Sequence, residues 1–136
     1  METRHNELTN RRVGDLFPRK WLNGQSLPGP LLVRLVGLET ATVMPRPGAP
    51  PETAHVLRFE VLDAQTRQPR ALPGHERNQA GYGLILTRRL AQQIAQAVGT
   101  DALDAWAGRV VVFEPGTWAG KRIVNVRAAR ADSAGR

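Results

Sequence analysis

Residues 31–43 read LLVRLVGLETATV, and this stretch is the most informative part of the sequence for predicting the fold. The first half alternates apolar positions from Leu31 to Leu35, and the second half alternates threonines, which predicts one long β-strand. Gly37 interrupts the alternation, and a glycine inside a strand often marks a bulge or a sharp bend. A small β-barrel needs such bends to close, so this stretch favours a barrel.

Four further segments carry a strand pattern: residues 55–62, 82–86, 109–113 and 121–127. Between the third and the fourth strand, a helix is expected over residues 88–98, because Leu90, Ile94 and Val98 fall on one face. Thr87 is a suitable N-cap, and Gly99 stands where a helix commonly ends. The order of elements is therefore strand, strand, strand, helix, strand, strand.

This order predicts an all-β fold with one helix, specifically an OB-fold-like five-stranded barrel with the helix between strands 3 and 4. In that fold the ligand lies across strands 2 and 3, between the loops that join strands 1–2 and 4–5. Here those loops are predicted at residues 44–53 and 114–120. A different α+β sheet packed by the same helix is the alternative. We expect one domain over residues 16–130, with flexible tails at 1–15 and 131–136.

The composition restricts the possible functions. The chain has 136 residues, a formal net charge of +7 and no cysteine, so disulfides and thiolate chemistry are excluded. Neither a signal peptide nor an apolar run of about 20 residues is evident, which favours a cytoplasmic protein without a membrane partner. The basic charge is attracted to phosphate backbones, although a GC-rich genome would also explain the many arginines.

Catalytic residues are harder to find. His5, His55 and His75 lie far apart, and no pair has the spacing of metal ligands on a helix. No nucleophile elbow, phosphate-binding loop or zinc-protease motif occurs. We therefore expect that the protein is not an enzyme and has no catalytic residue, metal site or cofactor. The sequence offers no convincing set of residues for a hydrolase or a nuclease.

Aromatic rings beside basic side chains are the pattern used by single-strand binders, which stack bases on exposed rings. Trp118 stands out because it lies in a turn-rich loop that offers little apolar cover. Phe59, Phe113 and Trp106 are instead expected in the core, and Arg88 and Arg89 on the outer face of the helix. The candidate nucleic-acid-binding residues are Trp118, Lys121, Arg122, Arg58, Arg34, Tyr82, Lys20 and Trp21.

Several short motifs appear in a fixed order: FPRKWL at 17–22, LRFE at 57–60, GLILTR at 83–88, WAGR at 106–109, FEP at 113–115 and GK at 120–121. In these motifs the chain resembles a family of small phage- and prophage-associated bacterial proteins, over most of residues 16–128. The resemblance implies an OB-like fold and a role in binding single-stranded DNA. It supplies no catalytic residues.

Two function hypotheses follow. The first is non-enzymatic binding of single-stranded nucleic acid, probably DNA, with little sequence preference, through a basic strand face and loop aromatics. The second is a protein–protein adaptor of a phage or mobile-element complex, in which the long polar loop at residues 63–81 grips a protein partner.

Overall fold

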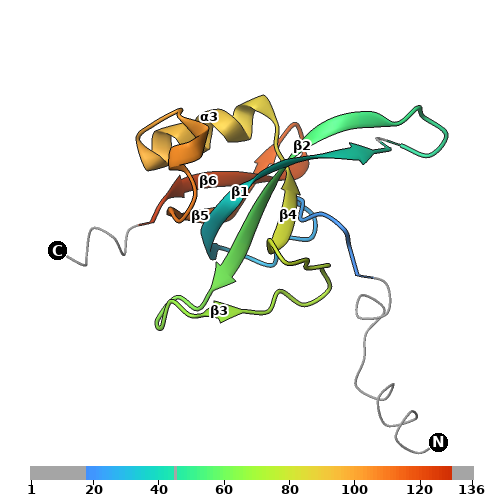
Figure 1. Ribbon diagram of the computed structural model, residues 1–136. Helices are drawn as coiled ribbons and strands as arrows, with labels where there is room; N and C mark the ends of the chain where they lie inside the picture. The colour runs from blue at the N-terminus through green and yellow to red at the C-terminus, as the bar shows by residue number, and fades with distance from the viewer. Residues whose placement is uncertain (1–17, 45, 130–136) are drawn as a thin grey trace, which may run out of the picture.

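The structure is a computed structural model that describes residues 18–44 and 46–129. The tails expected at 1–15 and 131–136 lie outside the described residues, as do His5 and Phe17. The described chain is mostly antiparallel sheet with one α-helix (Figure 1). Its elements are β1 (Leu31–Val43), β2 (Glu52–Leu62), β3 (Pro69–Arg70), β4 (Tyr82–Ile85), α3 (Arg88–Val98), a 3-10 turn η1 (Leu103–Ala105), β5 (Val110–Trp118) and β6 (Lys121–Ala128).

The six strands form one sheet in the order β3-β2-β1-β5-β6, and β4 pairs with β2 beside β3. Within the described part of the chain no pair joins β4 to β6, so the sheet is open at that point. The fold is thus all-β with one helix, as expected, and strand pairing alone does not close it. Helix α3 packs mainly on β6 and covers one end of the sheet (Figure 1).

Strand β1 carries the bend that its sequence predicts. The register with β2 shifts between Leu35 and Gly37, so that Leu35 pairs with Phe59 and Gly37 pairs with Arg58. Before the bulge β1 also pairs with β5, but only over residues 31–34. After the bulge β2 still pairs with β4 as far as Val56. Beyond that point β1 and β2 continue alone as a two-stranded arm, residues 40–43 and 52–55, which projects from the body at the right of Figure 1.

The core lies between the inner face of the sheet and α3. The rings of Phe59 and Phe113 meet edge to face with centroids 4.9 Å apart, and both residues are fully buried, as expected. The helix has the predicted bounds, and the Thr87 side chain accepts a hydrogen bond from the backbone N–H of Leu90. Leu90 and Ile94 are buried, while Val98 is only partly buried. No described helix has the length and apolar character needed to cross a membrane.

The loop predicted at residues 114–120 was wrong. Residues 114–118 extend β5 instead of forming a loop, and only Ala119 and Gly120 turn the chain. Both turn residues have positive φ, as a tight two-residue hairpin requires. Pro115 is tolerated because β1 no longer pairs with β5 at that point, so its missing N–H leaves no ladder bond unmade. Leu103, three residues before the buried Trp106, is 56% exposed.

The loop at 63–81 is held against the body. Asp63 accepts hydrogen bonds from the backbone N–H groups of Thr66 and Gln65, which lower the pKa of its carboxyl group. Further along, Leu72 is buried and its N–H donates to the hydroxyl of Tyr82. Arg77 forms an ion pair with Glu60 on β2.

Replacing Ile94 with Ala should lower the free energy of unfolding by roughly 2–5 kcal/mol, because the side chain is fully buried and its removal leaves a cavity. Urea denaturation measures the change. Leu103→Ala is the matched control, since it removes a similar side chain from an exposed position and should change stability by less than about 0.5 kcal/mol. Equal losses for the two variants would contradict the packing of α3.

Candidate nucleic-acid interface

The gap between β4 and β6 is occupied by the segment of residues 19–24. The backbone N–H of Leu22 donates to the carbonyl of Gly83 at 2.8 Å, and Leu22 forms a parallel bridge with Leu84 of β4. On the other side, Gly24 lies so close to the backbone of Arg122 on β6 that a Cβ atom would not fit. The segment therefore connects the two strands that do not pair with each other.

This placement fixes the ring of Trp21 against the outer face of β4. Two of its ring atoms, Cε3 and Cζ3, lie 2.7 Å from the position that a Cβ on Gly83 would take, so only glycine accommodates the ring there. The guanidinium carbon of Arg58 lies 5.5 Å from the ring centroid, and the ammonium nitrogen of Lys20 lies 5.3 Å from it. Both distances are typical of cation–π contacts.

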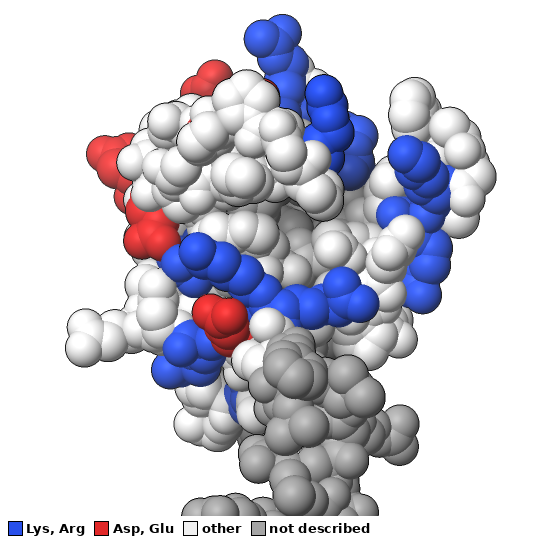
Figure 2. All heavy atoms as spheres, turned by 90° about the vertical axis from the view of Figure 1, so that its right-hand side faces the viewer, with Lys and Arg blue, Asp and Glu red and all other residues white. Residues whose placement is uncertain are grey.

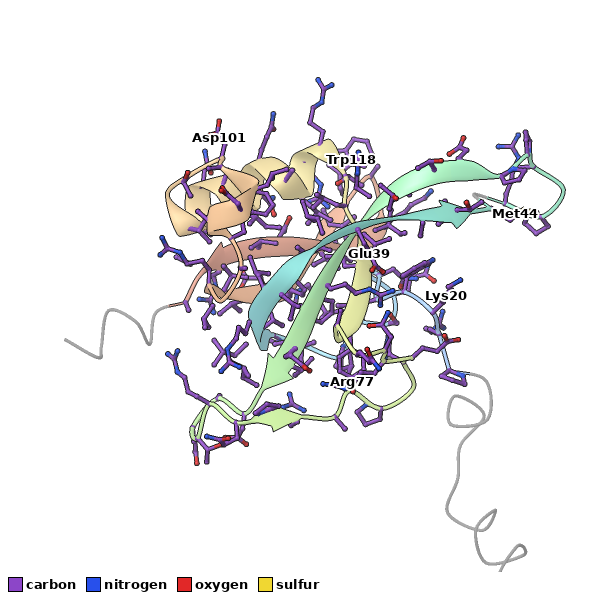
Figure 3. All side chains as sticks on the ribbon, viewed as in Figure 1. Lys20, Glu39, Met44, Arg77, Asp101 and Trp118 are labelled. Atoms are coloured by element: carbon purple, nitrogen blue, oxygen red, sulfur yellow. The ribbon has the colours of Figure 1, made fainter. Side chains whose placement is uncertain are left out.

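Trp21 and Ile85 separate two hollows, because both residues line each of them. The first, of about 290 Å³, lies between the 21–24 segment, the start of α3 and β6. The second, of about 560 Å³, lies between the segment and the β1–β2 arm. Its lining includes Lys20 and Met44, which lie on the same side of the molecule in Figure 3. The two hollows together form one groove, which we call the Trp21 groove.

The rim of the Trp21 groove is mostly basic. Figure 2, which views the molecule from the arm side, shows a hollow with Lys and Arg side chains above it, below it and to its right. The basic residues lining the groove are Lys20, Arg89 and Arg122, and Glu52 is the acidic one. Within residues 18–44 and 46–129, none of these three cations forms an ion pair. Their charge therefore remains available to an anion.

The β5–β6 hairpin places Trp118 directly opposite Lys121. Trp118 is 72% exposed, which makes it the most exposed large apolar side chain in the part of the chain described. Lys121 is exposed beside it, without a described ion-pair partner. The Trp118 ring and the Lys121 ammonium group are thus both exposed to solvent at the tip of the hairpin. Arg122, which lines the groove, follows directly in the sequence.

Three candidate residues occupy other environments. Tyr82 is 4% exposed and its ring packs on Phe59, so the expectation that it stacks a base was wrong. It is buried because β4 turns this ring inward, where its hydroxyl accepts from Leu72. Arg58 is bound to Glu39 and to the carbonyl of Gly81, and its side chain is 11% exposed. Arg34 pairs with Glu60 across β1 and β2 and lines neither hollow of the groove.

Sequence reasoning missed Arg89. It is exposed, as expected for the outer face of α3, but its guanidinium also donates to the Asn125 side chain at 2.8 Å and to the Val124 carbonyl at 2.9 Å, which was not expected. The helix lies along β6, so a long side chain from its first turn reaches that strand. Ile85 and Gly83 were missed too. Their role depends on the contact of Trp21 with β4, and no pattern within either stretch of sequence indicates that the two come together.

The described residues offer no group of three His, Asp or Glu side chains that could hold a metal ion. The chain as a whole was also compared with known proteins. No family model, no curated protein and no solved structure matches it. The geometry of the groove and of the hairpin therefore carries the functional argument.

Replacing Gly83 with Ala should displace Trp21, because a Cβ there would lie 2.7 Å from its ring. Overpacking of this kind costs about 1–3 kcal/mol. The measurement is urea denaturation together with the indole N–H signal of Trp21 in an NMR spectrum. Gly29→Ala is the control, since nothing lies within 4 Å of its Cβ position. An unchanged Trp21 signal in Gly83→Ala would show that the ring does not lie on β4.

Proposed function

We propose that the protein binds single-stranded nucleic acid, most simply DNA, along the Trp21 groove and the tip of the β5–β6 hairpin. The observation that carries this proposal is the joint placement of two tryptophan rings, the exposed Trp118 and the half-buried Trp21, with cations that have no described ion-pair partner. Bases stack on the rings, and the backbone phosphates are neutralised by Lys20, Arg122 and Lys121. The protein acts by binding and carries out no reaction.

The arrangement of strands supports this proposal. Strands β1, β2, β4, β5 and β6 with a helix between β4 and β5 are compatible with an OB-like, partly open barrel, in which the 19–24 segment takes the place of the missing strand pair. In OB-folds the ligand lies between the loops that join strands 1–2 and 4–5. The corresponding connections here are the tip of the β1–β2 arm and the turn of the β5–β6 hairpin, and the groove lies beside the arm.

The nature of the contacts supports a strand without strong sequence preference. Stacking on tryptophan is available to every base, and a guanidinium or ammonium group binds any phosphate. Rings of Trp118 and Trp21 are presented by separate elements, a hairpin and the inserted segment. Duplex DNA keeps its bases stacked inside the helix and cannot use such rings, so single strands should be preferred.

The adaptor hypothesis finds less support. Its gripping element was the loop at 63–81, which is bound to the body through Leu72, Tyr82 and the ion pair between Arg77 and Glu60. His75 also bonds the Ser26 hydroxyl at 2.9 Å. These attachments hold the loop on the body, so it is not free to close around a partner, although most of its side chains are exposed.

Replacing Trp118 with Ala should weaken binding of a labelled single-stranded oligonucleotide by roughly ten- to hundredfold, because a stacked base contributes about 1–3 kcal/mol. The melting temperature should barely change, since the ring is exposed. Fluorescence anisotropy and thermal unfolding measure the two quantities. Trp106→Ala is the control and should do the reverse, because Trp106 is buried and its indole N–H donates to the Thr100 carbonyl.

Anisotropy at two salt concentrations, with single-stranded and duplex oligonucleotides, separates the hypotheses. For single strands the logarithm of the binding constant should fall with the logarithm of the salt concentration by about 0.7 per phosphate neutralised. Absent binding at low salt, or binding that salt does not change, would contradict the proposal. Co-purification with one protein in the absence of oligonucleotide would then support the adaptor.

A further inference from the structure

The smaller hollow of the Trp21 groove exists because β4 and β6 do not pair. Leu22 bonds to β4 and Gly24 lies against β6, and these contacts leave a pocket of about 290 Å³ between the segment, α3 and β6. Small-molecule pockets usually measure about 300–1,000 Å³. The hollow is therefore of a size for one small unit, such as a single nucleotide, rather than for a longer segment of chain.

Two arginines at this pocket are held in place by neutral oxygen atoms. Arg89 donates to the Asn125 side chain and to the Val124 carbonyl, and Arg122 donates to the Leu27 carbonyl at 3.1 Å. Fixed guanidinium groups are well suited to phosphate, because their planar N–H donors match its oxygens. No described residue accepts from the Nε atom of either arginine. Each can therefore donate to a ligand without losing its present bonds.

Apart from Asn23 and Gly24, the rest of the pocket wall is mostly apolar side chains. They are the ring of Trp21 together with Leu22, Leu84, Ile85, Leu90 and Ile123. A free phosphate would leave this surface uncovered, and an apolar molecule without charge would leave both arginines without an anion. The ligand that satisfies both parts of the pocket carries a flat or apolar group beside a phosphate.

From this combination, and resting on the function proposed above, we infer that the pocket holds one nucleotide of the bound strand. Its base lies against Trp21 and the apolar wall, and its phosphate is bound by Arg89 and Arg122. Trp21 then separates this nucleotide from the next one, which lies in the larger hollow beside the arm. The 19–24 segment is thus part of the binding site as well as of the fold.

The test is an NMR titration of the full-length, ¹⁵N-labelled protein with thymidine monophosphate, thymidine and inorganic phosphate in turn. The chain has three tryptophans, so each indole N–H gives its own signal. Thymidine monophosphate should shift the Trp21 signal and leave that of Trp106 in place. Thymidine should bind at least about tenfold more weakly, because it lacks the group that the arginines bind. Inorganic phosphate should leave Trp21 unshifted.

Arg89→Gln and Arg122→Gln should each weaken binding of thymidine monophosphate by about tenfold. Arg88→Gln is the matched control, because Arg88 precedes Arg89 on the same helix, is exposed and does not line the pocket. Thermal unfolding checks that each variant is folded, and the titration of the unaltered protein does not depend on any variant.

Three results would overturn the inference: no shift of Trp21, an equal response to inorganic phosphate, or equal effects of Arg88→Gln and Arg89→Gln. The proposed function is judged separately, by oligonucleotide binding. If Arg89→Gln binds a long oligonucleotide as the unaltered protein does while Trp118→Ala does not, the pocket is wrong and the function stands. If the unaltered protein binds no oligonucleotide, the function is wrong.

Discussion

The contact of the 19–24 segment with β4 is the constraint on which the rest of the site depends. One backbone hydrogen bond, from Leu22 to Gly83, and the absence of a side chain on Gly83 let the Trp21 ring lie against the sheet. Without this contact the gap between β4 and β6 would expose unpaired backbone groups of both strands, and such edges are prone to pair with other chains. The segment covers the gap and at the same time builds the wall between two hollows.

The electrostatic properties of the groove follow from how its arginines are bound. Arg58, Arg77 and Arg127 each pair with a carboxylate, so their charge is compensated within the protein. Arg89 and Arg122 bond instead to carbonyl and amide oxygens, which orient them without cancelling their charge. The net charge of +7 is therefore unevenly distributed, and cations without a described carboxylate partner lie at the Trp21 groove and at the hairpin beside it.

Local patterns predicted the elements well, and the contacts between distant elements much less. The strand at 31–43, its bulge at Gly37 and the helix at 88–98 agree with the structure because periodicity and capping are local properties. The turn expected at 114–120 was wrong. Pro115 and Gly116 are typical turn residues, but here they lie in β5, where they pair with β6 alone and no longer with β1. Tyr82 was misplaced, and the hydrogen bonds of Arg89 to β6 were missed, for a related reason: the contacts of each side chain depend on the element that packs beside it. Trp118 was expected to be exposed and is exposed, while its role in binding stays a prediction.

Ultraviolet cross-linking tests the central claim most directly, with an oligonucleotide that carries 5-iododeoxyuridine in place of thymidine. Cleavage by trypsin leaves the three tryptophans in three different peptides, at residues 21–34, 90–109 and 110–121. If a strand lies along the Trp21 groove and the β5–β6 hairpin, cross-links should map to peptides 21–34 and 110–121. The peptide at 90–109, which holds the buried Trp106, should carry none. Cross-links found only outside the first two peptides would contradict this account.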